Sequence, residues 1–543
     1  MINKPQVARR GKTIMHTSHR IAVGVAIASS IVVLSGEPAF PQTPATPFRC
    51  NPMSDLLLAN PPNPTPATPF TLTPIGNTIL NSGLPCQEIV NPVEPAHPIG
   101  PPKTALENRQ RGFDFYSWLT FIALNSPADG SAIDKSAPNT PTRWEDMNNF
   151  RQLLDVMLPP NMMPPVPDPK DAKPLEDENE KVRLMPPACQ AQYKRGSGTM
   201  VIKMIEETFN QPFKTGPLID QSGHYALFDI LMNKAMYNYI HANHLYSQAG
   251  QRDQANSHLS IDFPAGHNLP APGMPGSDPG AIMIKVSWKI LDPDEVNSKR
   301  FHMVNALVSL PKSAKSDEEP PCLPETLGLV GFHVVHKTLS RPQWIWTSFE
   351  HIDNVPEQRE VDAGPLPHTY SFYDRTCNAG KCPVNETPPR PWDPDPASQL
   401  KFRGTFNSQI MRVTPLTPET VKMNKAFQGL LKDTVWQYYM LISTQWPSGF
   451  PCATIRSTVS PPNSPQPQTD FLKQPDMTCA PAPAILANST LETYSQGDIP
   501  LASSSCMACH GNAVSYQTRP ADAKTGDVYF NQSDFTFMLE KAQ

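Results

Sequence analysis

The chain has 543 residues and a net charge of −5, and only 17% of its residues are charged. This balance excludes the basic surface of a nucleic-acid-binding protein and the polybasic patch of a protein that binds anionic membranes. The sequence also contains 65 prolines, more than twice the ordinary share of ~5%. We therefore expect long extended loops and a packed core that is smaller than the length suggests.

The N-terminal residues 1–36 have the order of features of a secretory signal. An apolar run, Ile21–Leu34, is preceded by basic side chains and followed by Ser35 and Gly36. The basic residues are Lys4, Arg9, Arg10, Lys12 and Arg20. An uncleaved anchor is the alternative, but the run is shorter than the ~20 residues that span a bilayer. We predict a signal peptide, export to the periplasm, and no stable membrane anchor after cleavage.

Three regions of different composition follow the predicted signal. Residues 37–107 are rich in proline, threonine and asparagine and lack periodicity, which predicts an extended region. Residues 108–450 alternate between helical and strand patterns and are expected to form the main domain. Residues 451–543 are predicted to be a C-terminal segment packed on that domain.

Helix predictions in the main domain rest on apolar spacing and on proline. The dense apolar stretch Phe113–Leu124 predicts a buried helix, ended by the proline that follows. Helical spacing of apolar residues predicts two more helices, over Trp144–Leu158 and His224–Tyr246. A later helix is predicted from Thr417 towards Lys432, because a proline follows this capping threonine at the first helical position.

Strand predictions come from two-residue alternation. Ile282–Ile290 alternates apolar and polar side chains, the pattern of a half-buried strand. Further strands are predicted over Phe301–Leu310, Leu327–Thr338, Trp344–Ile352 and Val435–Trp446. The second and third of these should form a hairpin. The fold class that follows is α+β, an antiparallel-sheet main domain with packed helices and a Pro-rich N-terminal region.

The segment Cys506-Met507-Ala508-Cys509-His510 contains the pattern Cys-x-x-Cys-His. On a helical turn, two thiols at this spacing can bond to the two vinyl groups of one porphyrin edge, and the histidine can place its imidazole on the iron. A structural disulfide, a redox dithiol and half of a zinc site are the alternatives. A dithiol enzyme would need a thioredoxin-like βαβ setting, and zinc would need a second ligand pair nearby, and neither pattern is present.

The motif therefore predicts one covalent haem c, with Cys506 and Cys509 as anchors and His510 as proximal iron ligand. Because the sequence ends at Gln543, we expect the preceding chain to cover part of the haem. Three residues are candidates for the sixth ligand: Met538, His333 and His336. On a strand the two histidines point to opposite faces, so at most one can face the haem. An open sixth position is the remaining alternative.

The other eight of the ten cysteines are expected to form disulfides in an oxidising compartment. Spacing favours Cys377 with Cys382, Cys452 with Cys479 and Cys50 with Cys86, and leaves Cys189 and Cys322 as a further pair. Free buried thiols are the alternative.

For two polar clusters we favour a structural role over a binding role. Glu350 and His351 belong to a run that could line a pocket, but the end of a sheet core in a polar loop is favoured. His241 and His244 have the spacing of metal ligands, yet no acidic partner accompanies them, and a solvated helix face is preferred.

Four segments resemble bacterial exported proteins identified as members of the cytochrome c family. They are YSWLTFIALNSP (Tyr116–Pro127), GFHVVHKTLSRPQWIWTSFEHIDN (Gly331–Asn354), VWQYYMLISTQWP (Val435–Pro447) and SSCMACHG (Ser504–Gly511). The resemblance implies a periplasmic location and one covalent haem, and it implies no substrate.

The function expected from the sequence is that of a periplasmic monohaem c-type cytochrome that transfers single electrons. Its partner would be a redox protein or a small-molecule electron donor or acceptor. The alternative is a haem enzyme of the oxidase, peroxidase or reductase type, or a haem-based sensor, with the main domain as substrate or ligand site. A third interpretation is a binding or assembly protein in which the haem is structural.

Overall fold

The computed structural model describes part of the chain, and every described residue lies within one compact unit, Thr46–Gln543. The described residues are 49–52, 72, 76–81, 83–88, 102–129, 131, 133, 140–157, 185, 187–193, 200–203, 211–212, 215–257, 259, 261–268, 276–309, 322–377, 381–389, 406–447, 481–496, 504–511, 513–515 and 533–542. The predicted signal peptide lies outside them.

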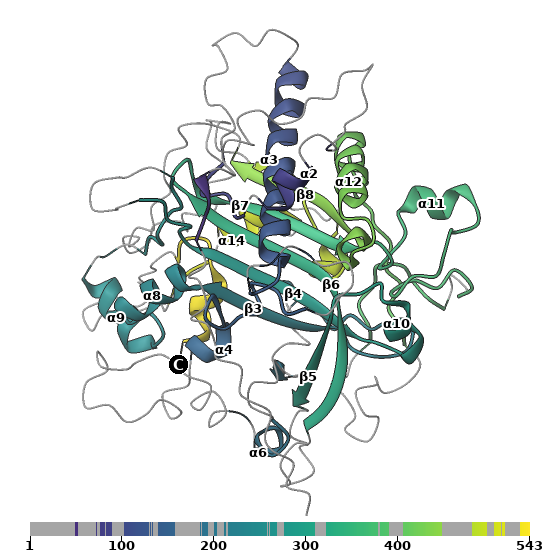
Figure 1. Cartoon of the computed structure of the whole chain (residues 1–543). Helices are drawn as coiled ribbons and strands as arrows, with labels where there is room; N and C mark the ends of the chain where they lie inside the picture. The colour runs from purple at the N-terminus through teal and green to yellow at the C-terminus, as the bar shows by residue number, and fades with distance from the viewer. Residues whose placement is uncertain are drawn as a thin grey trace, which may run out of the picture. The chain divides into compact units, whose positions relative to one another are not determined.

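The centre of the fold is a mixed sheet, which shows the α+β class (Figure 1). Within the described residues it has nine strands, seven of them in the order β1-β3-β4-β6-β7-β8-β9. These seven are β1 (Phe150–Gln152), β3 (Leu227–Asn233), β4 (Ile282–Ile290), β6 (Cys322–Thr338), β7 (Arg341–His351), β8 (Tyr439–Pro447) and β9 (Pro481–Ala482). All of their pairings are antiparallel.

The long strand β6 branches the sheet. Its first part pairs with β5 (Met303–Ser309), which in turn pairs in parallel with β2 (Met200–Lys203). Its second part lies between β4 and β7. The predicted strand over Ile282–Ile290 and the predicted hairpin of β6 with β7 are both confirmed, but β4 is buried on both faces instead of being half-buried as predicted.

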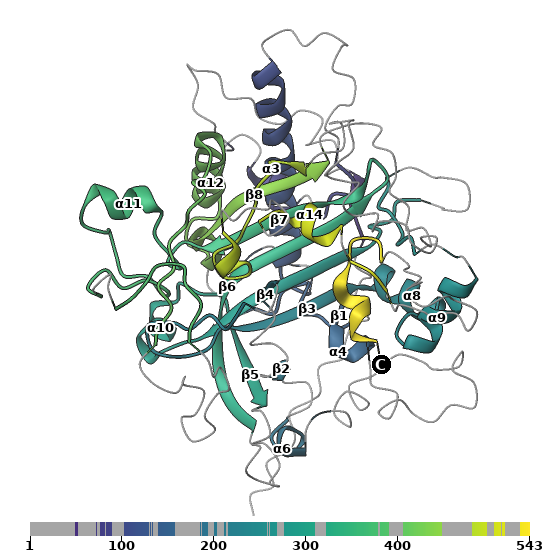
Figure 2. The same ribbon diagram turned by 180° about the vertical axis from the view of Figure 1, so that it is seen from behind.

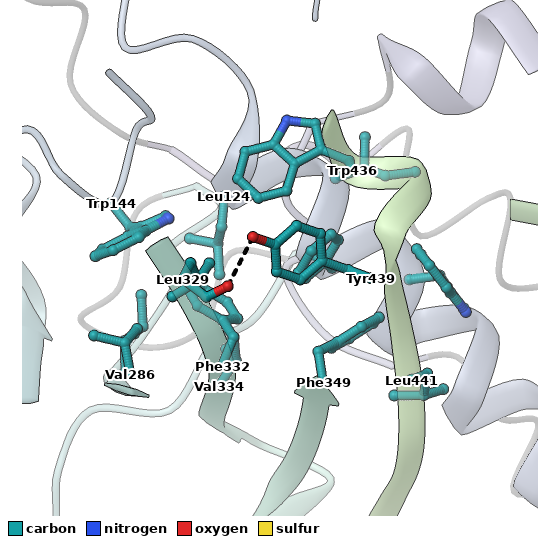
Figure 3. Packing of buried hydrophobic residues seen from close by; sticks show 14 of the residues in the cluster. Leu124, Trp144, Val286, Leu329, Phe332, Val334, Phe349, Trp436, Tyr439 and Leu441 are labelled. Atoms are coloured by element: carbon teal, nitrogen blue, oxygen red, sulfur yellow. Dashed lines mark hydrogen bonds between the residues drawn. The ribbon is translucent and has the colours of Figure 1, made fainter. Parts of the chain in front are cut away.

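One face of the sheet, which includes Phe332, Val334 and Phe349, is covered by helices α3 (Pro102–Asn125) and α12 (Pro418–Leu430) (Figure 1). We call it the helical face. Aromatic side chains dominate its core, and the Tyr439 hydroxyl donates a 2.9 Å hydrogen bond to the carbonyl of Leu329 (Figure 3). The predicted helices at α3 and α12 are confirmed.

The capping of α12 is also as predicted. The Thr417 side chain accepts a hydrogen bond from the backbone N–H of Thr420, and Pro418 occupies the first turn.

Two helix predictions are wrong in part. Within Trp144–Leu158 the structure has strand β1 and only the short helix α4 (Leu153–Val156). Within His224–Tyr246 the first part is strand β3, and helix α8 (Lys234–Ala242) begins only after Asn233, whose side chain caps it. β3 is buried on both faces, so its apolar residues do not alternate, and a run of this kind resembles a helix in sequence.

Several strand boundaries also differ from the predictions: β7 begins at Arg341 instead of Trp344, and β5 is shorter than Phe301–Leu310. β6 begins at Cys322 instead of Leu327, because its first residues pair with β5. Val435–Tyr438 is a 3₁₀ turn, η5, and β8 begins after it.

The remaining described helices are short. They are α2 (Gly76–Leu80), α6 (Pro187–Gln190), α9 (Gln248–Asn256), α10 (Pro293–Ser298), α11 (Gln358–Ala363) and α14 (Cys506–His510), with the 3₁₀ turns η7 (Thr493–Ser495) and η9 (Phe537–Lys541). Among the described residues, no helix has the length and apolar character needed to cross a membrane.

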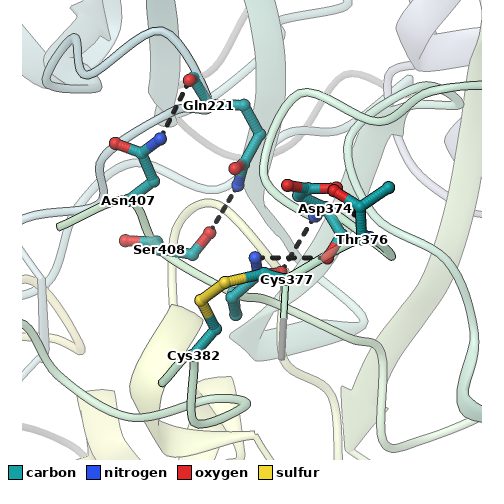
Figure 4. Close-up of a disulfide and its surroundings, with 8 residues drawn as sticks. Gln221, Asp374, Thr376, Cys377, Cys382, Asn407 and Ser408 are labelled. Atoms are coloured by element: carbon teal, nitrogen blue, oxygen red, sulfur yellow. Dashed lines mark hydrogen bonds between the residues drawn. A yellow bond between two sulfur atoms is a disulfide. The ribbon is translucent and has the colours of Figure 1, made fainter. Parts of the chain in front are cut away.

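Three of the predicted disulfides are present: Cys50–Cys86, Cys189–Cys322 and Cys377–Cys382. The last closes a turn in which Thr376 donates to Asp374, near the segment in which the Ser408 carbonyl accepts from Gln221 (Figure 4). The predicted pair Cys452–Cys479 lies outside the described residues.

The region predicted to be extended, residues 37–107, is packed where the structure describes it. Cys50, Leu72, Ile79, Leu84 and Cys86 are buried in the core of the helical face. The Cys50–Cys86 disulfide and α2 fix this part of the chain to the main domain, so its high proline content does not keep it apart from the core.

Candidate haem-attachment site

Helix α14, which contains the Cys-x-x-Cys-His motif, lies on the face of the sheet opposite α3 and contacts β7 and β8 (Figure 2). We call this the motif face. Its apolar cluster includes Val335 and Trp346 from the sheet, Met507 from α14, and Phe535 and Met538 from the C-terminal segment. Met507 is fully buried, so the residue between the two cysteines anchors the motif in the core.

The buried side chain of Gln445 on β8 holds the start of α14. Its Oε1 accepts hydrogen bonds from the backbone N–H of Met507 (2.8 Å) and the hydroxyl of Ser505 (3.2 Å). Its amide nitrogen donates to the carbonyl of Pro483 (2.7 Å). Since the first N–H groups of a helix have no partner inside the helix, Gln445 supplies one and fixes α14 to the sheet.

Replacing Gln445 by leucine should lower the free energy of unfolding by about 1–3 kcal/mol, because the buried N–H of Met507 loses its partner. Urea unfolding measures this loss. Gln437→Leu is the matched control, since its amide makes one bond to the carbonyl of Thr434 at the part-buried turn η5. Equal losses for the two variants would contradict the role of Gln445.

Cys506 and Cys509 are free thiols, whereas the other described cysteines are all in disulfides. Burial raises the pKa of the Cys509 thiol to about 11 and that of Cys506 well above its usual value, and the carboxylate of Glu492 adds to both shifts. A redox dithiol needs a lowered thiol pKa, so this environment disfavours that alternative. The described residues also contain no group of three or more metal-binding side chains, the arrangement that zinc would require.

The imidazole of His510 is held in one orientation. Its Nδ1 lies 2.9 Å from the carbonyl oxygen of Phe535. Because a carbonyl can only accept, Nδ1 carries the proton and the lone pair is on Nε2, the arrangement found in metal-ligating histidines. The rings of Trp346 and Phe537 lie 4.5 Å and 5.1 Å from the imidazole, and burial lowers its pKa to about 4. His510 is therefore a neutral, oriented imidazole at neutral pH.

A buried ion pair fixes the carbonyl that orients His510. Asp534, the residue before Phe535, accepts hydrogen bonds from Lys337 Nζ on β6 (2.5 Å) and from the backbone N–H of Phe263 (2.8 Å). Asp534 and Phe535 both have positive φ, 50° and 65°. Non-glycine residues keep this conformation only where contacts impose it, and here the ion pair does so.

The three sixth-ligand candidates lie in different places. His336 is on the helical face, where its Nδ1 contacts the Tyr116 hydroxyl of α3 and its Nε2 lies 2.5 Å from the carbonyl of Pro279. Met538 is buried in the cluster of the motif face, three residues after the carbonyl that binds His510 Nδ1. His333 lies on the motif face beside Glu492. The sheet thus separates His336 from the motif.

The two polar clusters noted in the sequence contact other side chains and backbone groups of the protein. Glu350 is fully buried and pairs with Arg412, whose Nη2 lies 2.6 Å away. His351 is also buried, and its Nε2 lies 3.1 Å from the carbonyl of Arg300. His241 and His244 lie against the ring of Tyr246 at the end of α8.

Gln445, Asp534 and Glu492 were not predicted from the sequence as parts of the site. Gln445 lies on β8, and Glu492 and Asp534 lie in turns that are distant from the motif in sequence. No local sequence pattern therefore marks them as parts of the site. No protein-family model, no curated protein and no solved structure matches the chain. The case for function therefore rests on the motif and its geometry.

Proposed function

We propose that the protein is an exported, periplasmic c-type cytochrome that carries one covalent haem and transfers single electrons. Cys506 and Cys509 would form the thioether bonds, and His510 would be the proximal iron ligand. The observation that carries the proposal is the hydrogen bond from His510 Nδ1 to the Phe535 carbonyl, next to two unpaired thiols on one helical turn. Four segments that resemble exported cytochrome c family proteins support the same proposal.

A bound haem c supplies reversible one-electron chemistry at its iron. The chain provides the surroundings that this chemistry needs. Phe535 holds the proton on Nδ1 of His510, Trp346 and Phe537 keep the imidazole in an apolar environment, and Gln445 fixes the motif helix to the sheet. A rigid, water-poor ligand environment stabilises one orientation of the axial ligand and tunes the potential.

The proposed location rests on three features that belong together in an oxidising compartment. They are the N-terminal signal pattern, the disulfides and the thiols of the motif. We propose a redox protein or a small-molecule electron donor or acceptor as partner.

A redox titration with carbon monoxide tests the function. The protein, produced with its export signal in a host that attaches haem c, should titrate as one centre with a slope of ~59 mV per tenfold change in the ratio. The reduced form should not bind carbon monoxide. A high-spin haem that binds carbon monoxide would contradict electron transfer and favour the haem enzyme or sensor.

Replacing Asp534 by asparagine should raise the reduction potential and destabilise the fold by about 3 kcal/mol, because Lys337 loses its buried partner. The potential rises because a less firmly held Phe535 carbonyl leaves His510 a weaker donor to oxidised iron. Potentiometry and urea unfolding measure the two effects. Asp262→Asn is the control: this carboxylate also lies 2.5 Å from Lys337 Nζ, but its side chain is 68% exposed. Equal potentials in both variants would refute this role of Asp534.

A further inference from the structure

His333 lies in the middle of β6, on the motif face. Its partners in register are Lys285 on β4 and Ser348 on β7. Two residues along the same strand, Val335 pairs with Trp346, whose ring contacts His510. Because side chains alternate along a strand, His333 and Val335 point to the same side of the sheet, the side that carries α14.

The Nε2 atom of His333 is buried without a hydrogen bond: it is inaccessible to solvent and finds no hydrogen-bond partner among the described residues. This Nε2 lies 3.4 Å from Oε2 of Glu492, an ion-pair contact without hydrogen-bond geometry, and the side chain of His333 is only 12% exposed. A buried polar nitrogen left in this state costs free energy, so it requires an explanation.

The electrostatic surroundings place His333 in the same local environment as the motif. Burial, followed by the charge of Lys285 and that of His510, lowers the pKa of His333 well below its usual value. Lys285 also lowers the pKa of His510, and Glu492 raises the pKa of both cysteine thiols. Lys285 and Glu492 therefore lie close to both His333 and the motif, which places the imidazole of His333 near Cys506, Cys509 and His510.

The other two candidates lack this combination. Both ring nitrogens of His336 have partners on the helical face. Met538 is buried in the apolar cluster of the motif face, three residues after the carbonyl that binds Nδ1 of His510, and it has no buried nitrogen to satisfy.

We propose that His333 is the second axial ligand, so that the imidazoles of His510 and His333 both coordinate the haem iron. This inference rests on the proposed function, since it requires the covalent haem. It assigns a use to a buried nitrogen that makes no hydrogen bond within the described part of the chain. It also explains why the sheet contributes a histidine at this position: bis-imidazole coordination closes the iron to small ligands and favours electron transfer.

Spectra of His333→Ala test the proposal. The purified variant should keep its covalent haem on a denaturing gel. Its iron should change from low-spin to high-spin in absorption and electron paramagnetic resonance spectra, and the reduced form should gain carbon monoxide binding. Added imidazole should restore the low-spin spectrum. A low-spin spectrum unchanged from the wild type would overturn the assignment, and so would a wild type that is already high-spin.

Three further variants make the outcome decisive. His241→Ala removes a partly exposed histidine of α8 and should leave the spectrum unchanged. Met538→Leu keeps the core volume, and a high-spin spectrum in this variant would identify Met538 as the ligand instead. His333→Met should stay low-spin with a raised potential. This last variant decides the question if His333→Ala does not fold, and an unchanged potential would then count against His333.

The experiment separates this inference from the proposed function. A wild type without covalent haem would refute the function itself. A wild type with covalent low-spin haem whose spectrum does not respond to His333 would refute only the ligand assignment.

Discussion

Replacing both Cys506 and Cys509 by serine should leave the exported protein without covalently attached haem. The two thiols lie one helical turn apart on α14, unpaired and part-buried, and serine cannot form a thioether. Each single variant should retain at most one bond and lose most of its haem. Haem staining of a denaturing gel measures the attached cofactor, because only covalently bound haem remains with the chain after denaturation.

Cys377→Ser/Cys382→Ser is the matched control. It also removes two cysteines, but these form a disulfide in a separate turn (Figure 4). This variant should stain as strongly as the wild type. Loss of stain in both double variants would mean that haem attachment fails for a general reason, such as misfolding. Stain retained in Cys506→Ser/Cys509→Ser would contradict attachment at the motif.

Replacing Glu350 by alanine should lower the free energy of unfolding by about 3–5 kcal/mol, because Arg412 is left as an uncompensated buried charge. Glu350 also accepts hydrogen bonds from the backbone N–H and the hydroxyl of Ser489, at 2.5 Å and 2.6 Å. The variant therefore loosens the segment that leads to Glu492 near the motif. Urea unfolding, followed by tryptophan fluorescence, measures the loss.

The pair of Glu419 and Lys422 on α12 provides the control for Glu350. Their atoms lie 2.9 Å apart, but the lysine side chain is 59% exposed, so Lys422→Ala should cost no more than about 1 kcal/mol. Replacing Glu350 and Arg412 together by apolar residues should recover part of the loss, because no unpaired charge then remains. A loss for Glu350→Ala as small as that for Lys422→Ala would contradict the buried ion pair.

The features that could be predicted from the sequence are those that depend on neighbouring residues. The Cys-x-x-Cys-His motif, the cap of α12 and the alternation in Ile282–Ile290 are all local patterns, and the structure has a helix or strand at each. The disulfides Cys50–Cys86 and Cys377–Cys382 also join cysteines that are near in sequence.

One of the wrong helix predictions falls on a strand, β3, that is buried on both faces. Leu227 and Leu231 of β3 belong to the core of the helical face. Phe228 and Met232 point to the other side of the sheet and belong to other apolar clusters. The side chains of β3 therefore lack the alternation that distinguishes a strand from a helix. The period of apolar residues could not reveal that the predicted helix over His224–Tyr246 begins as a strand.

The surroundings of the motif could not be predicted, because they depend on where distant segments meet. Strand geometry shows that His333 and His336 point to opposite faces, but it does not show which face receives α14. That follows from the contact of α14 with β7 and β8 and from the bonds of Gln445. Asp534 and Lys337 pair across a long stretch of chain, and neither has a local signal.

The most direct test of the central claim is a mass-spectrometric peptide map of the wild-type protein, purified from a periplasm that attaches haem c. We predict that the peptide containing Cys506, Cys509 and His510 carries the mass of one haem, bound through both sulfurs. The same peptide found without haem, either as two free thiols or with Cys506 and Cys509 joined as a disulfide, would contradict the account.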